Sequence, residues 1–123
     1  MLGDSKAFSG FAVDDLEKAK AFYEDTLGLK TSEENGLMTL RLAGDRPTLV
    51  YPKPDHEPAS YTVLNFPVED IDAAVGALME RGVAFEIYES GGQDDKGIMR
   101  QYGPPIAWFR DPAGNILSVI QLD

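Results

Sequence analysis

Two segments of the chain carry the same pattern of apolar and acidic residues, and this repeat constrains the fold more than any other feature. Residues 11–19 read FAVDDLEKA and residues 66–74 read FPVEDIDAA, which aligns Asp15 with Asp70. In both copies an apolar run ends at an aspartate that can accept the free N–H groups of a first helical turn. Since a repeat of this length is one supersecondary unit, the sequence predicts two copies of one module.

Each copy is predicted to form a strand, a helix and three further strands. The helices have apolar residues at helical spacing and end at Gly28 and Gly82, where glycine can adopt a left-handed C-cap. In the first copy the N-cap is Asp14 or Asp15, because Asp14 and Glu17 also have the spacing of a capping box. Turn residues separate the later strands, which are predicted at 30–33, 37–42 and 48–51 in the first copy and at 84–88, 106–110 and 116–121 in the second.

The predicted fold class is therefore α+β, with two βαβββ modules in a single domain over residues 1–123. Module one spans residues 6–52 and module two spans residues 60–123, and a linker with three prolines covers residues 53–59. The stretch from 89 to 103 is rich in glycine and charge and is predicted to be a loop. A loop of this length is either a functional lid or simply a mobile segment.

Composition excludes several classes of function. The chain has no cysteine, which rules out disulfides, thiolate metal sites and cysteine nucleophiles. A net charge of −10 would repel a phosphate backbone, so we expect no nucleic-acid partner. No apolar stretch approaches the roughly 20 residues needed to cross a bilayer, and the first residues lack the features of a signal peptide. We therefore expect a cytoplasmic protein with no membrane partner.

Two runs near opposite ends of the chain resemble a known superfamily. Residues 13–29, VDDLEKAKAFYEDTLGL, are similar to the opening of the vicinal oxygen chelate proteins, which include glyoxalases, bleomycin-resistance proteins and extradiol dioxygenases. Residues 107–117, AWFRDPAGNIL, are similar to their usual ending. The resemblance implies two βαβββ modules whose mixed sheets curl into an open, barrel-like cleft, and it implies a homodimer. It does not fix the function, because one scaffold can support unrelated chemistries.

The resemblance also implies where a metal would be held. Relatives that use a metal offer histidine, glutamine or glutamate from the first and last strands of each module. The matching positions here are Phe8, Val63, Val50 and Ser118. Three of these side chains cannot bind a metal, and a neutral hydroxyl is a weak ligand for a divalent ion. We therefore expect no metal and no other cofactor, and the only histidine, His56, lies in the linker.

The cleft implied by the resemblance is expected to be partly apolar with a few polar groups, as in most small-molecule pockets. Strand alternation and the family positions together predict its lining. The predicted ligand-binding residues are Phe8, Val50, Val63, Asn65, Trp108, Ser118, Arg41, Arg100 and Tyr102. The alternative is that the apolar members of this set simply fill the interior as core.

Two classes of function fit these features. The first is a metal-free small-molecule binding protein of the glyoxalase/bleomycin-resistance type, which holds an organic, cationic or aromatic ligand. The second is a metal-dependent lyase, isomerase or dioxygenase with unconventional ligands, which requires acids or His56 to converge on one point. A third possibility, a regulatory module with a vestigial cleft, has no positive sign in the sequence. No catalytic residue is predicted.

Overall fold

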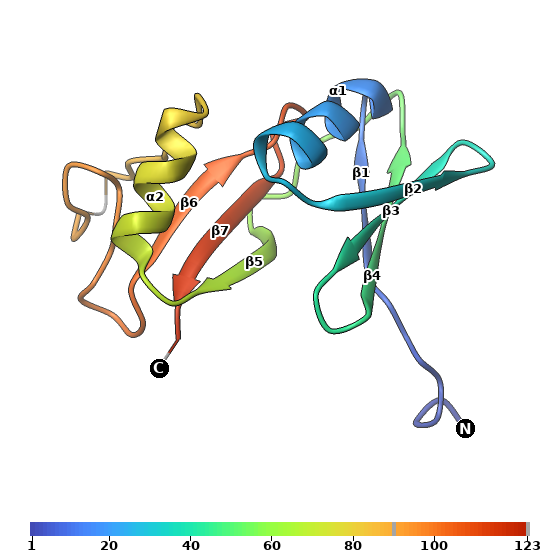
Figure 1. Cartoon of the computed structure of the whole chain (residues 1–123), viewed down its shortest axis with the longest axis horizontal. Helices are drawn as coiled ribbons and strands as arrows, with labels where there is room; N and C mark the ends of the chain where they lie inside the picture. The colour runs from blue at the N-terminus through green and yellow to red at the C-terminus, as the bar shows by residue number, and fades with distance from the viewer. Residues whose placement is uncertain (90, 123) are drawn as a thin grey trace. The chain divides into compact units, whose positions relative to one another are not determined.

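The computed structural model describes residues 1–89 and 91–122. It divides into two compact units, Met1–His56 and Glu57–Asp123, and each contains one copy of the repeat (Figure 1). Two mixed sheets and two α-helices make up the fold, which confirms the predicted α+β class. None of the helices in the described residues is both long enough and apolar enough to cross a membrane.

The first unit has the predicted βαβββ order. Its elements are β1 (Gly10–Val13), α1 (Leu16–Ala21), the π-helix η1 (Phe22–Thr26), β2 (Lys30–Glu34), β3 (Leu37–Leu42) and β4 (Arg46–Pro52). The strand order is β1-β4-β3-β2, in which β1 runs parallel to β4 and the other pairs are antiparallel. Asn35 and Gly36, with φ of 55° and 78°, form the tight turn between β2 and β3.

The first helix begins as predicted but ends differently. Asp15, not Asp14, is the N-cap, and its Oδ1 accepts from the Lys18 N–H at 3.1 Å. A regular α-helix was expected up to Gly28, but the last turns widen into a π-helix, in which the Leu27 N–H donates to the Phe22 carbonyl at 3.0 Å. Tyr23 lies in this wider segment and is fully buried, with its ring 6.1 Å from the ring of Phe11.

One face of the first sheet is the core of its unit. The register pairs Met38 with Val50 and Leu40 with Thr48, and all four side chains are buried together with Tyr23. Because side chains alternate along a strand, Thr39, Arg41 and Leu49 lie on the opposite face. We call this the open face of the first sheet, since neither α1 nor η1 covers it.

The second unit contains β5 (Thr62–Val68), α2 (Ile71–Glu80), β6 (Ile106–Arg110) and β7 (Ile116–Gln121). The sheet order is β5-β7-β6, with β5 parallel to β7 and β6 antiparallel to it. The Gln121 side-chain carbonyl accepts from the Ile71 N–H at 2.9 Å, which ties α2 to one face of this sheet. Phe109, Leu117 and Val119 are buried on that face, so Ser118 and Trp108 lie on the opposite one, the open face of the second sheet.

The strand predicted at 84–88 is wrong. The backbone of this segment is joined to β6 by an isolated bridge between Phe85 and Phe109 and by a bond from the Glu86 N–H to the Trp108 carbonyl at 2.8 Å, which do not make a regular strand. The side chain of Gln93 makes hydrogen bonds to this segment that a neighbouring strand would otherwise make. Its Oε1 accepts from the Tyr88 N–H at 2.7 Å, and its Nε2 donates to the Glu86 carbonyl at 2.8 Å. The second sheet therefore has three strands where four were expected.

Replacing Asp70 with alanine should lower the free energy of unfolding by about 1 kcal/mol. The Asp70 Oδ1 accepts from the Ala73 N–H at 3.1 Å, and alanine would leave this donor at the start of α2 without its cap. Urea denaturation followed by circular dichroism measures the change. Glu69→Ala is the matched control, because it removes a neighbouring exposed carboxylate outside the cap and should change stability by less than about 0.5 kcal/mol.

Candidate small-molecule site

The open face of the second sheet carries a row of polar and aromatic side chains. The register places Ser118 between Asn65 on β5 and Trp108 on β6. The buried Ser118 hydroxyl donates to the Asn65 amide oxygen at 2.5 Å. Since the amide oxygen is used in this bond, the Asn65 NH₂ group is left to donate outward from an exposed side chain. The pair therefore presents an oriented hydrogen-bond donor on this face.

Trp108 and Tyr88 form an aromatic wall beside this donor. Their ring centroids lie 5.6 Å apart with an interplanar angle of 66°, an edge-to-face contact between two half-buried side chains. Burial raises the pKa of the Tyr88 phenol above its ordinary value; the charge of Glu86 adds to this effect and that of Arg110 opposes it. The phenol therefore stays protonated at neutral pH and can donate a hydrogen bond.

An ion pair borders the aromatic wall. Arg110 Nε donates to the Glu86 carboxylate at 2.5 Å, and Arg110 Nη1 donates to the Gly114 carbonyl at 2.9 Å. The hydrogen bond to Glu86 also raises the pKa of Arg110. Because the two charges neutralise each other, this edge adds rigidity to the wall and little net charge.

The open face of the first sheet carries a hollow of about 220 Å³. It is lined by Phe8, Thr39, Arg41, Pro47 and Leu49. Phe8 precedes β1, so the first-strand position predicted for it lies outside the strand, and its side chain is 62% exposed. The Arg41 Nε donates to the Ser32 hydroxyl at 3.2 Å.

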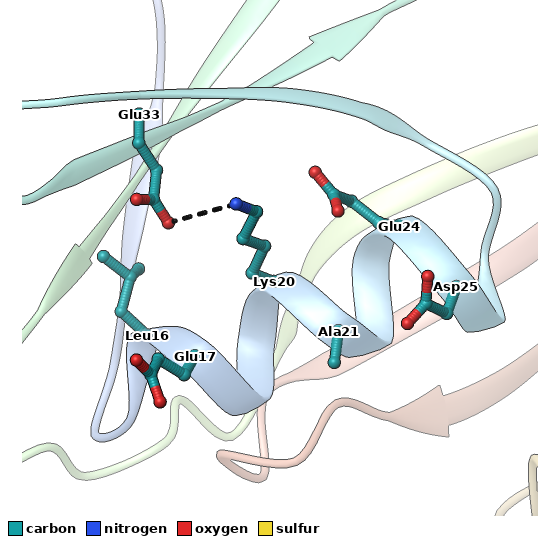
Figure 2. A pocket seen from close by; sticks show the side chains of 7 residues that line it. All are labelled: Leu16, Glu17, Lys20, Ala21, Glu24, Asp25 and Glu33. Atoms are coloured by element: carbon teal, nitrogen blue, oxygen red, sulfur yellow. Dashed lines mark ion pairs between the residues drawn. The ribbon is translucent and has the colours of Figure 1, made fainter.

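A second, larger hollow of about 520 Å³ lies between α1, η1 and β2 (Figure 2). Four of its lining residues are acidic, and Glu33 and Glu24 among them have polar partners. Glu33 lies 3.9 Å from Lys20 Nζ, and Glu24 accepts a hydrogen bond from the Thr31 hydroxyl. This hollow has no aromatic wall, and its charge would favour a cation.

The structure brings some predicted site residues together and separates others. Asn65, Ser118 and Trp108 form one row, and Phe8 shares its hollow with Arg41. The predicted role of these five residues in binding is consistent with their placement and stays a prediction.

Val50 is placed differently from the expectation. It is fully buried on the core face, and β1 pairs Gly10 with Leu49 where β5 pairs Asn65 with Ser118. Since Gly10 and Asn65 are equivalent in the repeat, the register makes Leu49, not Val50, the counterpart of Ser118. Leu49 faces the open side, and the sequence alignment was one residue out.

The other predicted site residues have different surroundings. Val63 is half-buried at an irregularity of β5 between Thr62 and Leu64. Arg100 pairs with Asp72 at 2.8 Å and lies 3.7 Å from Asp94, so its charge is already balanced. Tyr102 is 79% exposed. Sequence reasoning missed Thr39 and Tyr88; Thr39 could have been found from its spacing of two from Arg41, but Tyr88 was hidden in a segment predicted to be a strand.

The residues at the family's metal positions do not fit a metal. With the register corrected they are Phe8, Leu49, Val63 and Ser118, and the single oxygen among them already donates its proton to Asn65. Across residues 1–89 and 91–122 there is no group of three histidine, cysteine, aspartate or glutamate side chains that could hold an ion. His56 belongs to no such group, and its buried Nε2 has no hydrogen-bond partner among the described residues.

Comparison with known proteins establishes the family. The profile of the Glyoxalase/Bleomycin resistance protein/Dioxygenase superfamily matches residues 8–119, so the chain belongs to this superfamily. No curated protein sequence matches the chain.

Solved structures of related proteins share the fold. An antibiotic binding protein, TnmS3 from Streptomyces sp. CB03234, is 26% identical with a TM-score of 0.70, and the match covers 98% of both chains. A glyoxalase/bleomycin resistance protein from the same organism is 27% identical with a TM-score of 0.63 over 94% of this chain and 100% of that one. The fosfomycin resistance protein FosX from Listeria monocytogenes is 12% identical with a TM-score of 0.73, covering 98% and 94%, and shows the shared fold alone.

Proposed function

We propose that this protein binds a small organic molecule on the open face of its second sheet through hydrogen bonds and aromatic contacts, without a metal. The single observation that carries the proposal is the row of Asn65, Ser118 and Trp108. At a position where metal-using relatives have an anionic ligand, this chain has a buried hydroxyl that orients an amide donor. Directed donors beside an aromatic wall are the usual composition of a ligand pocket.

Similarity to TnmS3 supports the proposal. That protein is described as antibiotic binding, and the match extends over almost the whole of both chains at 26% identity. The function proposed here is accordingly to hold or sequester an organic molecule. A metal-dependent lyase, isomerase or dioxygenase has no specific support in the arrangement of side chains, because the residues at the metal positions offer no anionic or imidazole ligand.

The binding proposal predicts saturable binding of aromatic compounds that touches Trp108. Three compounds of similar shape and different charge form the panel: 2-naphthoate, 2-naphthamide and 2-naphthylmethylammonium. Isothermal titration should give saturable heat for at least one compound. Because Trp108 is the only tryptophan, its indole N–H gives one NMR cross-peak, and this peak should move on titration.

Two outcomes would contradict the binding proposal. One is a flat titration for all three compounds. The other is saturable binding that leaves the Trp108 indole peak in place, which would locate the ligand away from the row. A homodimer is a further proposal that rests on the resemblance of the two sequence runs, and a cytoplasmic location stays a prediction. Sedimentation velocity tests the homodimer, and a monomer at micromolar concentration would refute it.

A further inference from the structure

The hollow at Phe8 and Arg41 has a chemical character that the rest of this acidic chain lacks. It is smaller than the roughly 300–1,000 Å³ of pockets that enclose a whole drug-sized ligand, so it fits one end of a molecule. Its lining holds one cation, one hydroxyl and three apolar side chains, and it has no carboxylate. A chain with a net charge of −10 therefore presents a locally positive hollow on the open face of its first sheet.

Arg41 keeps most of its hydrogen-bonding capacity. Its Nε is bonded to the Ser32 hydroxyl, but no carboxylate of the described residues lies within ion-pair distance of its guanidinium. Arg100 and Arg110, by contrast, are paired with acids. The register adds a second cation, because Lys30 is the cross-strand partner of Arg41. A planar guanidinium with free donors can bind a carboxylate in a bidentate manner.

The apolar part of the hollow complements this cation. Phe8 is mostly exposed although its ring is large and apolar, and Leu49 and Pro47 line the same hollow. Covering an exposed phenyl ring with the ring of a ligand favours binding, because it removes apolar surface from water. Thr39, which lies next to Arg41 on this face, can donate or accept one further hydrogen bond.

We infer that the hollow on the first sheet is a separate site for a molecule with an aromatic ring and an anionic oxygen group, which Arg41 binds while the ring packs against Phe8. This inference goes beyond the proposed function, which concerns the row on the second sheet. It differs from the preference for a cation that the overall acidity of the chain suggests. A cationic ligand would instead be drawn to the acidic hollow beside α1, where Glu17, Glu24, Asp25 and Glu33 gather (Figure 2).

The naphthalene panel tests the inference with charge as the only major variable. Isothermal titration should show 2-naphthoate binding about tenfold tighter than 2-naphthamide, because a hydrogen bond to a charged group is stronger than a neutral one. In Arg41→Gln this difference should disappear, while Arg41→Lys should retain part of it. Lys18→Gln is the matched control, since it removes one positive charge from the exposed side of α1 and should leave the preference unchanged.

The possible outcomes distinguish a failure of this inference from a failure of the proposed function. Equal affinities for 2-naphthoate and 2-naphthamide, tighter binding of the ammonium compound, or a preference that survives in Arg41→Gln would each overturn the anionic ligand and leave small-molecule binding intact. Failure of all three compounds to bind would overturn the proposed function itself. Circular dichroism of Arg41→Gln shows whether the variant is folded, and the exposed position of Arg41 predicts that it is.

Discussion

Asp111→Ala should lower the free energy of unfolding by about 3 kcal/mol, the largest stability change expected from any single substitution outside the apolar core. Asp111 is almost fully buried before the last turn of the chain. Its Oδ1 accepts from the N–H groups of Ala113 at 3.0 Å and Asn115 at 2.8 Å, and its Oδ2 accepts from Asn115 Nδ2 at 3.0 Å. Alanine would leave these donors without their acceptor just before the start of β7.

Urea denaturation measures the effect, and Asp111→Asn is the comparison variant. Asparagine keeps one side-chain acceptor and loses the charge, so its cost should be about half that of alanine. A loss below about 1 kcal/mol for Asp111→Ala would show that water replaces the carboxylate at this turn. The turn also bears on function, because it sets the start of β7 and thereby the position of Ser118.

Asn65→Leu is expected to weaken the binding of 2-naphthamide about tenfold while keeping the branched shape of the side chain. The Asn65 NH₂ group is the outward donor of the row, and leucine would leave an oxygen of the ligand desolvated and unpaired. Ser118→Ala should have a smaller effect in the same direction, because it removes the hydroxyl that orients the amide. Isothermal titration measures both, and the Trp108 indole peak should still move.

A matched variant distinguishes a lost contact from a general disturbance. Thr62→Val lies on the same strand and alters a half-buried hydroxyl outside the row, so its affinity should equal that of the original chain. If Asn65→Leu binds 2-naphthamide as tightly as the original chain, the amide does not contact the ligand. The row would then be a structural feature of the sheet.

Much of the fold could be predicted because the signals are local. The strands at 37–42, 106–110 and 116–121 have the predicted bounds, since alternation and the flanking turn residues mark both ends. Asp15 and Asp70 cap the two helices as their place in the repeat indicates. Each of these features depends on residues within a few positions of one another.

The failures depend on contacts between distant residues or on register. The segment 84–88 has a strand-like composition, but Gln93 satisfies its backbone from the loop that follows, and composition alone does not reveal this. The π-helix arises where Tyr23 becomes fully buried against the sheet. Val50 was assigned the position that belongs to Leu49, and a shift of one residue moves a side chain to the other face of a strand.

The candidate site could be predicted in part for the same reasons. Asn65, Ser118 and Trp108 were named from the family positions and from alternation, and pairing between strands placed them in one row. The bond between Ser118 and Asn65 required the parallel register of β5 and β7, which no local pattern specifies. The hollow at Phe8 likewise depends on Pro47 and Leu49, which come from β4, about 40 residues further along the chain.

Independence from metal is the most direct test of the claim that hydrogen bonds and aromatic contacts replace a metal at this site. Protein purified without chelator should contain no stoichiometric transition metal by elemental analysis. Its titration with 2-naphthamide should be unchanged by prior treatment with EDTA or by added Mn²⁺ or Zn²⁺. One equivalent of bound metal, or binding that appears only after a divalent ion is added, would contradict the account.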